Sequence, residues 1–252
     1  DGSYNTNGAA IGTMGTGLTG ISYYNPAPII DLCRFQNESD RLLATLYGSV
    51  EPVKGLVAKT QFGIDNMTSE SSNFYTPVAG DGYSDNGDAE QYFNRPKRWT
   101  WTNTIEYGLV TGQHNFKAIA GTEAYDNNST YLYGYRNSFP FKDVNYITLN
   151  TGLLGITNSD SNSSYSLFSL FGRLNYTFAD KYMVEAVVRR DGSSRFGNQK
   201  YGIFPAFSVG WRVSEEAFMA STKSWLNELK LRLGYGSVGN DRMGNYNSYT
   251  QF

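Results

Sequence analysis

The chain contains 252 residues, among them 21 basic and 23 acidic side chains, which leave a formal net charge of -2. This balance gives no overall electrostatic reason to bind a polyanion, so we expect no nucleic acid among the partners. Aromatic residues make up 15% of the chain, with 20 tyrosines, and glycine contributes 27 residues. Such a mixture favours strands and tight turns over helices and predicts an all-β protein.

The mean hydropathy is -0.45, which on its own resembles that of a soluble protein. No stretch of the sequence reaches the roughly 18 consecutive apolar residues that a membrane helix needs. The strands of a membrane barrel, however, alternate apolar residues that face lipid with polar residues that face the lumen, so their average hydropathy is also low. The period of the pattern is therefore more informative than its mean.

Apolar and polar residues alternate in two neighbouring segments near the start of the chain. Between residues 41 and 51 the apolar positions are even-numbered, beginning with Leu42, and the polar positions are mostly odd-numbered. The alternation repeats over residues 56 to 65, after a turn-forming segment from Pro52 to Gly55. A period of two on either side of a turn predicts a β-hairpin with one apolar face.

Three further strand pairs show the same alternation. They comprise residues 98 to 109 with 115 to 125, residues 166 to 178 with 182 to 190, and residues 202 to 213 with 228 to 238. The first two have short turns, around Gly112 and Asp180, whereas the last has a connection around Glu216 that is long enough for a helical turn. We expect the tip of one hairpin at Asp180 and a row of lipid-facing side chains beside it, namely Phe168, Leu170, Leu174 and Tyr176.

Long segments rich in Asn, Asp, Ser, Gly and Tyr separate these pairs, so short and long connections alternate along the chain. The long segments are residues 66 to 97, 126 to 165, 191 to 201 and the stretch after 238. In an up-and-down barrel every second connection lies on the same rim, and outer-membrane barrels have short periplasmic turns and longer external loops. We therefore expect the long segments to lie outside the cell.

The predicted strands are about ten residues long, near the roughly 9 to 11 residues with which a tilted strand crosses a bilayer. Aromatic residues gather near the predicted strand ends, where their rings would lie at the level of the lipid headgroups. These residues are Trp99, Trp101, Phe178, Tyr182, Trp211 and Trp225. The alternative is a soluble β-sandwich or solenoid, in which the same rings are core or surface packing.

A specific sequence resemblance covers residues 171 to 213. This segment includes Arg-Arg-Asp-Gly-Ser-Ser-Arg-Phe-Gly and Tyr-Gly-Ile-Phe-Pro-Ala-Phe-Ser-Val-Gly-Trp-Arg-Val, and it resembles the barrel signature of SusC/RagA-family TonB-dependent transporters in order and spacing. The likeness continues through residues 229 to 240 and Gly244-Asn245-Tyr246. It is weaker back to the hairpin around Gly55, and about the first 40 residues show no resemblance.

This resemblance implies a fold and a function. Family members are plugged, antiparallel up-and-down barrels of about 22 strands, and residues 1 to 252 would form part of that barrel domain without the plug and the N-terminal extension. The implied function is TonB-dependent import of oligosaccharides or peptides across the cell outer membrane. The implied partners are a SusD-like surface lipoprotein, TonB and the surrounding lipid, with neither an enzymatic activity nor a cofactor. The alternative function is a passive porin, or a structural or adhesive barrel; the choice between glycan and peptide stays open.

The residues that could carry chemistry favour structural roles. His114 is the only histidine and has no carboxylate or cysteine next to it in sequence, so a metal or nucleophile site is unconvincing. Ser193 and Ser194 lack the turn and the base that accompany a catalytic serine. Cys33 is the only cysteine, which excludes an intramolecular disulfide, and we expect it to be structural. We therefore expect no catalytic, cofactor-binding or metal-binding residues.

An acidic stretch within residues 66 to 97 offers oxygen ligands. Asp81, Asp85 and Asp88 could bind calcium, but their spacing departs from that of an EF-hand loop. A solvated acidic loop is the favoured interpretation, and calcium binding there stays open.

Two further sets of residues are candidate contacts. On the lumen side, four polar side chains could hold a plug or satisfy one another, and we favour the second: Arg173, Asn175, Glu185 and Arg189. In the long external segments, tyrosines could stack on sugars, pack against a partner lid or pack within their own loops. These candidate substrate or partner contacts are Tyr75, Tyr83, Tyr92, Tyr131, Tyr133 and Tyr135.

Overall fold

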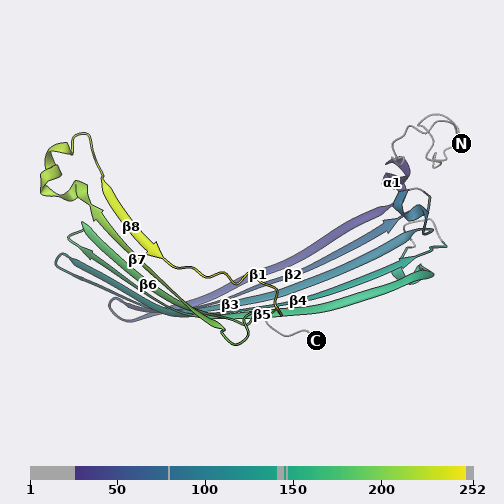
Figure 1. The fold of residues 1–252 in the computed structure, drawn as a ribbon, viewed down its shortest axis with the longest axis horizontal. Helices are drawn as coiled ribbons and strands as arrows, with labels where there is room; N and C mark the ends of the chain where they lie inside the picture. The colour runs from purple at the N-terminus through teal and green to yellow at the C-terminus, as the bar shows by residue number, and fades with distance from the viewer. Residues whose placement is uncertain (1–25, 79, 141–144, 146, 248–252) are drawn as a thin grey trace. The chain divides into compact units, whose positions relative to one another are not determined.

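The computed structural model describes residues 26–78, 80–140, 145 and 147–247 (Figure 1). Its helices and strands, with η for a 3-10 helix, are α1 (Pro26–Leu32), β1 (Arg34–Val53), β2 (Leu56–Tyr75), η1 (Gly80–Tyr83), β3 (Asp88–Thr111), β4 (His114–Asn137), η3 (Leu149–Thr151), β5 (Leu154–Phe178), β6 (Tyr182–Ser193), β7 (Tyr201–Arg212), η4 (Val213–Glu215), η5 (Ala217–Thr222) and β8 (Lys230–Gly236). No helix among the described residues is long and apolar enough to cross a membrane. Residues 1–25, part of the stretch without a recognised resemblance, lie outside the described residues.

In the described part of the chain, eight strands form one antiparallel sheet and are hydrogen-bonded in the order of the sequence, from β1 to β8. Strands β1 and β8 are therefore its two edges. This order confirms the predicted all-β class and the four predicted hairpins. In the β5–β6 hairpin, Phe178 lies opposite Tyr182, which places the tip at Asp180 as predicted.

The first five strands are longer than the predicted ten residues. Strands β1 to β5 contain 20 to 25 residues each, whereas β6 and β7 contain 12 and β8 contains 7. The prediction that residues 66–97 and 126–165 are connections is therefore wrong for most of their length, and the connections that remain are residues 76–87 and 138–153. Polar side chains on both faces hide the alternation in these segments, but pairing with a neighbouring strand still satisfies the backbone.

Glycine makes the tight turn between β1 and β2 possible. Gly55 has a φ of 83°, in the left-handed region that favours glycine. Its carbonyl oxygen accepts a hydrogen bond of 2.8 Å from the N–H of Gly108 in β3, and its own N–H donates to Glu51 Oε1 at 2.7 Å. A β-carbon built on Gly55 would overlap the carbonyl oxygen of Gly108. The turn is therefore fitted closely against the next strand.

We expect Gly55→Ala to lower the free energy of unfolding by about 1–3 kcal/mol, because it adds the cost of a positive φ to an overlap with a backbone oxygen. Gly108→Ala is the matched control, since a β-carbon there meets nothing within 4 Å. Urea titration of both variants, followed by tryptophan fluorescence, measures the difference. Equal losses of stability in the two variants would contradict the role given to Gly55.

The described chain divides into two compact units. The first unit comprises Asp1–Leu42, Asn66–Pro96 and Ser129–Ser163, and the second comprises Leu43–Asp65, Lys97–Asn128 and Ser164–Phe252. The first unit has a small core in which the rings of Phe74 and Phe139 meet edge to face with centres 5.5 Å apart. In the second unit most large apolar side chains are exposed. A large exposed apolar surface is typical of a face that contacts another protein or a membrane.

Cys33, just before β1, has the structural role predicted for it. Its Sγ accepts a hydrogen bond of 3.3 Å from the backbone N–H of Thr76. Burial raises the pKa of the Cys33 thiol, so the residue remains a neutral thiol at physiological pH.

Candidate functional site

The sheet of the second unit has one polar and one apolar face, because polar and apolar residues alternate along its strands. In β3, for example, the side chains of Arg98 and Thr102 form hydrogen bonds with acidic and amide groups on one face. Trp99 and Trp101, at the intervening positions, are exposed on the other face. The two faces can therefore meet different surroundings.

Charged side chains on the polar face form hydrogen bonds and ion pairs with one another. Arg189 donates from Nη2 to Glu123 Oε1 at 2.9 Å and to Ser169 Oγ at 2.8 Å, and from Nε to Asp191 Oδ1 at 2.6 Å. Further groups are Arg98 with Asp65 and Asn127, and Arg173 with Glu185. Three of the four side chains predicted on the lumen side, Arg173, Glu185 and Arg189, thus contact other polar groups of the same sheet. These contacts support the favoured interpretation, in which the polar side chains form hydrogen bonds and ion pairs with one another. Asn175 lies directly opposite Glu185 in the β5–β6 register.

A row of aromatic rings crosses the apolar face of the second unit beside the short turns. His114 Nδ1 lies 2.8 Å from Tyr176 Oη, and the ring of Phe116 stacks on that of Tyr176 with centres 4.6 Å apart. The stacked rings of Phe178 and Tyr182 continue the row, and Trp211 lies opposite Tyr182 in the register. We call these six residues the near row: His114, Phe116, Tyr176, Phe178, Tyr182 and Trp211. The predicted position near strand ends is confirmed for Phe178, Tyr182 and Trp211, but it is wrong for Trp99 and Trp101, which lie in the middle of β3 because that strand is longer than predicted. His114 is one of the packed rings of the near row.

A second aromatic group lies on the same face, farther along the strands from the short turns. The ring of Phe62 stacks on that of Trp99 with centres 6.1 Å apart. Trp101 Nε1 donates a hydrogen bond of 3.0 Å to Thr60 Oγ1. We call Phe62, Trp99 and Trp101 the far group.

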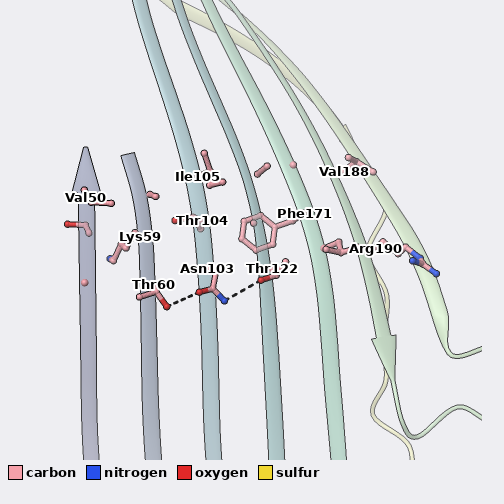
Figure 2. Close-up of a pocket in the computed structure, with 17 residues that line it drawn as sticks. Val50, Lys59, Thr60, Asn103, Thr104, Ile105, Thr122, Phe171, Val188 and Arg190 are labelled. Atoms are coloured by element: carbon pink, nitrogen blue, oxygen red, sulfur yellow. Dashed lines mark hydrogen bonds between the residues drawn. The ribbon is translucent and has the colours of Figure 1, made fainter. Parts of the chain in front are cut away.

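A depression of about 830 Å³ is lined by β1 to β6 in the second unit (Figure 2). Small residues help to form it, namely Gly48, Ala58, Ala120 and Gly172. A chain of hydrogen bonds crosses it, from Thr60 Oγ1 to Asn103 Oδ1 at 2.7 Å and from Asn103 Nδ2 to Thr122 Oγ1 at 3.4 Å, as Figure 2 shows. Because these polar groups satisfy one another, they fit apolar surroundings at little cost.

Tyrosines and carboxylates gather on one face of the first unit. Tyr133 donates from Oη to Glu90 Oε1 at 3.2 Å, and Tyr135 donates to Asp88 Oδ1 at 2.8 Å. The carboxylates belong to β3 and the tyrosines to β4, so the pairing of these two strands brings the groups together. The result is a surface of phenol hydroxyls and carboxylates.

Two more predicted tyrosines extend this surface. The ring centre of Tyr92 lies 4.9 Å from that of Tyr133 and 6.4 Å from that of Tyr131. The structure thus brings together four of the six predicted tyrosines, on strands rather than in loops. We call the whole set the tyrosine-carboxylate cluster: Asp88, Glu90, Tyr92, Tyr131, Tyr133 and Tyr135.

The other two predicted tyrosines, Tyr75 and Tyr83, do not belong to the tyrosine-carboxylate cluster. Tyr75 is the last residue of β2, and its ring meets that of Phe35 edge to face with centres 5.2 Å apart. Tyr83 ends η1 and exposes 66% of its surface. Tyr83 is therefore the most accessible of the predicted tyrosines for a probe in solution.

Burial raises the pKa of three phenols in the cluster, those of Tyr92, Tyr133 and Tyr135. For Tyr135 burial is the largest cause, followed by the hydrogen bond donated to Asp88, and the pKa rises from 10.0 to about 12. The pKa of Tyr133 is also raised, first by burial and then by the charge of Glu90. These phenols therefore remain neutral hydrogen-bond donors over the physiological pH range.

We expect the first unit to lose stability as the pH rises from 10 to about 12. The folded state holds the Tyr135 proton more tightly than the unfolded chain, so this contribution is complete below pH 10 and is lost as the pH rises through the folded pKa of about 12. Amide hydrogen exchange of β4 across this window measures the loss. Tyr135→Phe should show a smaller pH dependence, and identical profiles for the two proteins would contradict this assignment.

The remaining candidates have contacts of a structural kind. Ser193 Oγ donates to Asp241 Oδ2 at 3.4 Å, and Ser194 Oγ accepts a hydrogen bond of 2.9 Å from the N–H of Ser166. Asp88 belongs to the tyrosine-carboxylate cluster. Within the described ranges, no group of three or more His, Cys, Asp or Glu side chains is arranged to hold a metal ion.

Arg195 makes a set of contacts that the sequence did not predict, although the residue lies in a motif that carries the family resemblance. The guanidinium of Arg195, in the Arg-Asp-Gly-Ser-Ser-Arg motif, lies 3.6 Å from the ring centre of Tyr165. It also donates from Nε to Asn245 Oδ1 at 2.8 Å and from Nη1 to the carbonyl oxygen of Asp241 at 3.1 Å. The motif therefore joins the β6–β7 connection to β5 and to the segment after β8.

Comparisons with curated proteins find TonB-dependent receptors. The chain is 33% identical over 230 residues to TonB-dependent receptor P39 of Formosa agariphila, which covers 84% of this chain and 21% of that protein. It is 28% identical over 246 residues to TonB-dependent receptor P3 of the same organism, covering 96% and 24%. A shorter match, 41% identical over 85 residues, is with TonB-dependent receptor SusC of Bacteroides thetaiotaomicron, covering 33% and 8%. The chain thus spans at most about a quarter of the length of these relatives. No family model matches it.

Solved structures with a similar fold include a transporter. The RagAB peptide importer in its 'open-open' state matches with a TM-score of 0.81 and 25% identity, covering 91% of this chain and 26% of that chain. The 'closed-closed' state matches with a TM-score of 0.79 and 24% identity, covering 89% and 25%, which shows the fold alone. By their names, the proteins that resemble this chain are receptors and transporters rather than enzymes.

Proposed function

We propose that this chain, which belongs to the SusC/RagA family of TonB-dependent outer-membrane transporters, forms part of the wall of an importer for oligosaccharides or peptides. The observation that carries the membrane placement is the presence of two aromatic groups, the near row and the far group, on the apolar face of one sheet. Outer-membrane barrels have such girdles at both interfaces of an apolar band.

The distance between the two groups supports this placement. In β3, Trp99 of the far group precedes Thr111, the last residue of the strand, and His114 of the near row is the first residue of β4. From Trp99 to Thr111 the strand advances 12 positions, which corresponds to about 40 Å along the strand and, at a tilt of about 35–45°, to roughly 28–33 Å across the membrane. The hydrocarbon core of a bilayer is about 30 Å thick. The apolar face between the two groups is therefore suited to lipid.

The polar face then lines the lumen. Its ion pairs are partly exposed, so each contributes little to stability, but each pairs a charged group of the wall with an opposite charge. The lipid-facing depression also fits, because Thr60, Asn103 and Thr122 satisfy one another there. These features match the alternation by which membrane barrels separate lipid from water.

The orientation follows from the connections. We place the short turns at Gly55, Gly112 and Asp180 in the periplasm. Because β3 crosses the bilayer between Trp99 and its turn, its preceding residues, which include Asp88 and Glu90, lie on the extracellular side. The tyrosine-carboxylate cluster is then available to cargo or to a SusD-like lipoprotein lid, and TonB acts from the periplasm through parts of the importer other than this barrel segment.

The cluster is suited to sugars and to peptides alike. Phenol rings stack on sugar rings and on aromatic side chains, and carboxylates accept hydrogen bonds from hydroxyl, amide and ammonium groups. RagAB, one of the similar structures, is by its title a peptide importer, whereas SusC is named as a TonB-dependent receptor. We therefore keep both cargo classes in the proposal.

The test measures uptake in cells that make the full-length transporter. Fluorescent oligosaccharides and fluorescent peptides are supplied separately, with and without TonB, and we expect TonB-dependent uptake of one class. Tyr92→Ala with Tyr133→Ala should reduce that uptake about tenfold, because two stacking surfaces worth roughly 0.5–1.5 kcal/mol each are lost. The Tyr92→Phe, Tyr133→Phe pair is the control, since it keeps the rings.

Two outcomes contradict the proposal. Uptake of both classes that does not depend on TonB would favour the alternative of a passive porin. Normal uptake by the double alanine variant, at an equal surface level, would remove the cluster from the path of the cargo while leaving the transporter assignment in place.

A further inference from the structure

The connection between β7 and β8, residues 213–229, differs from the other connections on its side of the sheet. The β1–β2, β3–β4 and β5–β6 turns contain two or three residues each, whereas this connection contains η4 and η5. Val213 and Ser214 at its start are buried, which fixes the connection to the end of the sheet. A connection that only reverses the direction of the chain needs neither this length nor a buried start. We therefore expect a further role for residues 213–229.

Hydrogen bonds bring this connection to the apolar face. Glu216 Oε1 accepts a hydrogen bond of 2.5 Å from Tyr182 Oη and one of 3.0 Å from Trp211 Nε1, and Lys181 Nζ lies 3.3 Å from Glu216 Oε2. Tyr182 and Trp211 lie opposite each other in the β6–β7 register and end the near row. The connection therefore folds against the polar tips of two rings at the end of the near row.

Beyond Glu216 the connection presents large apolar side chains outward. Phe218 exposes 66% of its surface and Trp225 exposes 73%. Its carboxylates, in contrast, have cationic neighbours: Glu215 pairs with Lys223 at 3.6 Å, Glu216 with Lys181 at 3.3 Å and Glu228 with Arg212 at 3.9 Å. The segment thus combines exposed aromatic rings with paired charges, and exposed aromatic rings are typical of segments that lie in a membrane interface.

We infer that residues 213–225 form an interfacial anchor that lies in the headgroup layer of the periplasmic leaflet, with the rings of Phe218 and Trp225 inserted among the phospholipids. This inference rests on the membrane placement proposed above. The occupant of the exposed surface is phospholipid rather than protein because the connection folds against the end of the near row, whose rings already lie at that depth. Tryptophan favours this layer, since its ring is apolar and its N–H finds polar partners there.

Glu216 fixes the depth of the anchor. The hydrogen bonds from Tyr182 and Trp211 lower its pKa, so it stays ionised and has to remain at the polar boundary. The two rings that donate to it are held with their polar tips at the same boundary. Phe218 and Trp225 follow within the next turns of chain and can reach the adjacent apolar layer.

Depth measurements on the full-length transporter in phospholipid nanodiscs test this inference. A nitroxide is attached at Phe218→Cys or Trp225→Cys in a background without other cysteines, and its collisions with oxygen, which concentrates in lipid, are compared with those of a water-soluble nickel chelate. Asn227→Cys, an exposed polar position of the same connection, is the aqueous control, and Leu174→Cys is the lipid control. We expect the oxygen-to-nickel ratio at 218 and 225 to be several-fold higher than at 227.

The outcomes separate this inference from the proposed function. A label at 225 that matches 227, with 174 in lipid, overturns the anchor and leaves the importer in place. A label at 225 that is shielded from both reagents shows that protein covers this surface, which also overturns the anchor. If 174 is itself aqueous, the membrane placement fails and the anchor fails with it. The label at 218 repeats the measurement in a protein that retains Trp225.

Discussion

Leu174→Arg is expected to lower the fraction of the protein that reaches its folded form in the membrane. Leu174 lies on the apolar face of β5, four positions before Phe178 of the near row, and exposes 51% of its surface. An arginine on the lipid face of a barrel costs roughly 2–4 kcal/mol at the bilayer midplane and about 0–1 kcal/mol near the interfaces. Leu174 lies two positions inward from Tyr176 of the near row, so we expect a cost between these values, up to about 2 kcal/mol. That is a large fraction of the stability of a typical domain, about 5–15 kcal/mol. Heat-modifiable migration of the isolated outer-membrane protein measures the folded fraction.

Asn175→Arg is the matched control, because it adds the same side chain at the next position of the same strand. Asn175 belongs to the polar face and lies opposite Glu185, so the new guanidinium meets water and a carboxylate. We expect a near-normal folded fraction for this variant. Equal yields for the two variants, or a loss at Asn175 alone, would contradict the assigned faces.

The hairpins could be predicted from the sequence because each combines two local signals. Period-two alternation marks the strands, and turn-forming residues mark their junctions, as at Gly55 and Asp180. The register follows from these two signals once the apolar residues share a face, and Phe178 does lie opposite Tyr182. The predicted lipid face of β5 is likewise a consequence of alternation, and its contact with lipid remains a prediction.

The full length of β1 to β5 could not be predicted, because the segments concerned lack alternation. Residues 66–75 are dominated by Asn, Thr, Ser and Glu, yet they continue β2. Where polar side chains occupy both faces of a strand, its sequence resembles that of a loop, and only pairing with neighbouring strands distinguishes the two. Such pairing joins segments that are far apart in sequence.

The candidate site was predicted by residue type but not by geometry. The tyrosines were identified as possible contacts, whereas Glu90 and the pairing of Tyr135 with Asp88 emerged only from the register of β3 with β4. The same applies to Glu216, whose role depends on the distant Tyr182. Composition can therefore indicate which side chains are candidates for binding, but strand pairing decides which of them meet.

Surface labelling of intact cells tests the proposed topology. Tyr83→Cys and Asp180→Cys are made in a Cys33→Ser background, in which the serine keeps an acceptor for the N–H of Thr76. Tyr83 is highly exposed in η1, and Asp180 is exposed in the β5–β6 turn. A membrane-impermeant maleimide should label position 83 on intact cells and position 180 only after the outer membrane is opened. These are all-or-none differences, since the reagent does not cross the membrane.

The same measurement tests whether the tyrosine-carboxylate cluster faces a lid. Tyr133→Cys should be labelled on intact cells that lack the SusD-like lipoprotein, and its labelling should fall when the lipoprotein is present. Partial burial of Tyr133 slows the reaction, so rates are compared with those of the unfolded variant. Unchanged labelling would place the lid elsewhere without affecting the topology.

The proposed membrane crossing is tested most directly by comparing positions 83 and 180 on intact and opened cells. We expect labelling at Tyr83→Cys before opening and at Asp180→Cys only afterwards. Labelling at Asp180→Cys on intact cells, together with labelling at Tyr83→Cys only after opening, would show that the sheet crosses the membrane in the opposite direction. Labelling of both positions on intact cells would contradict the crossing itself.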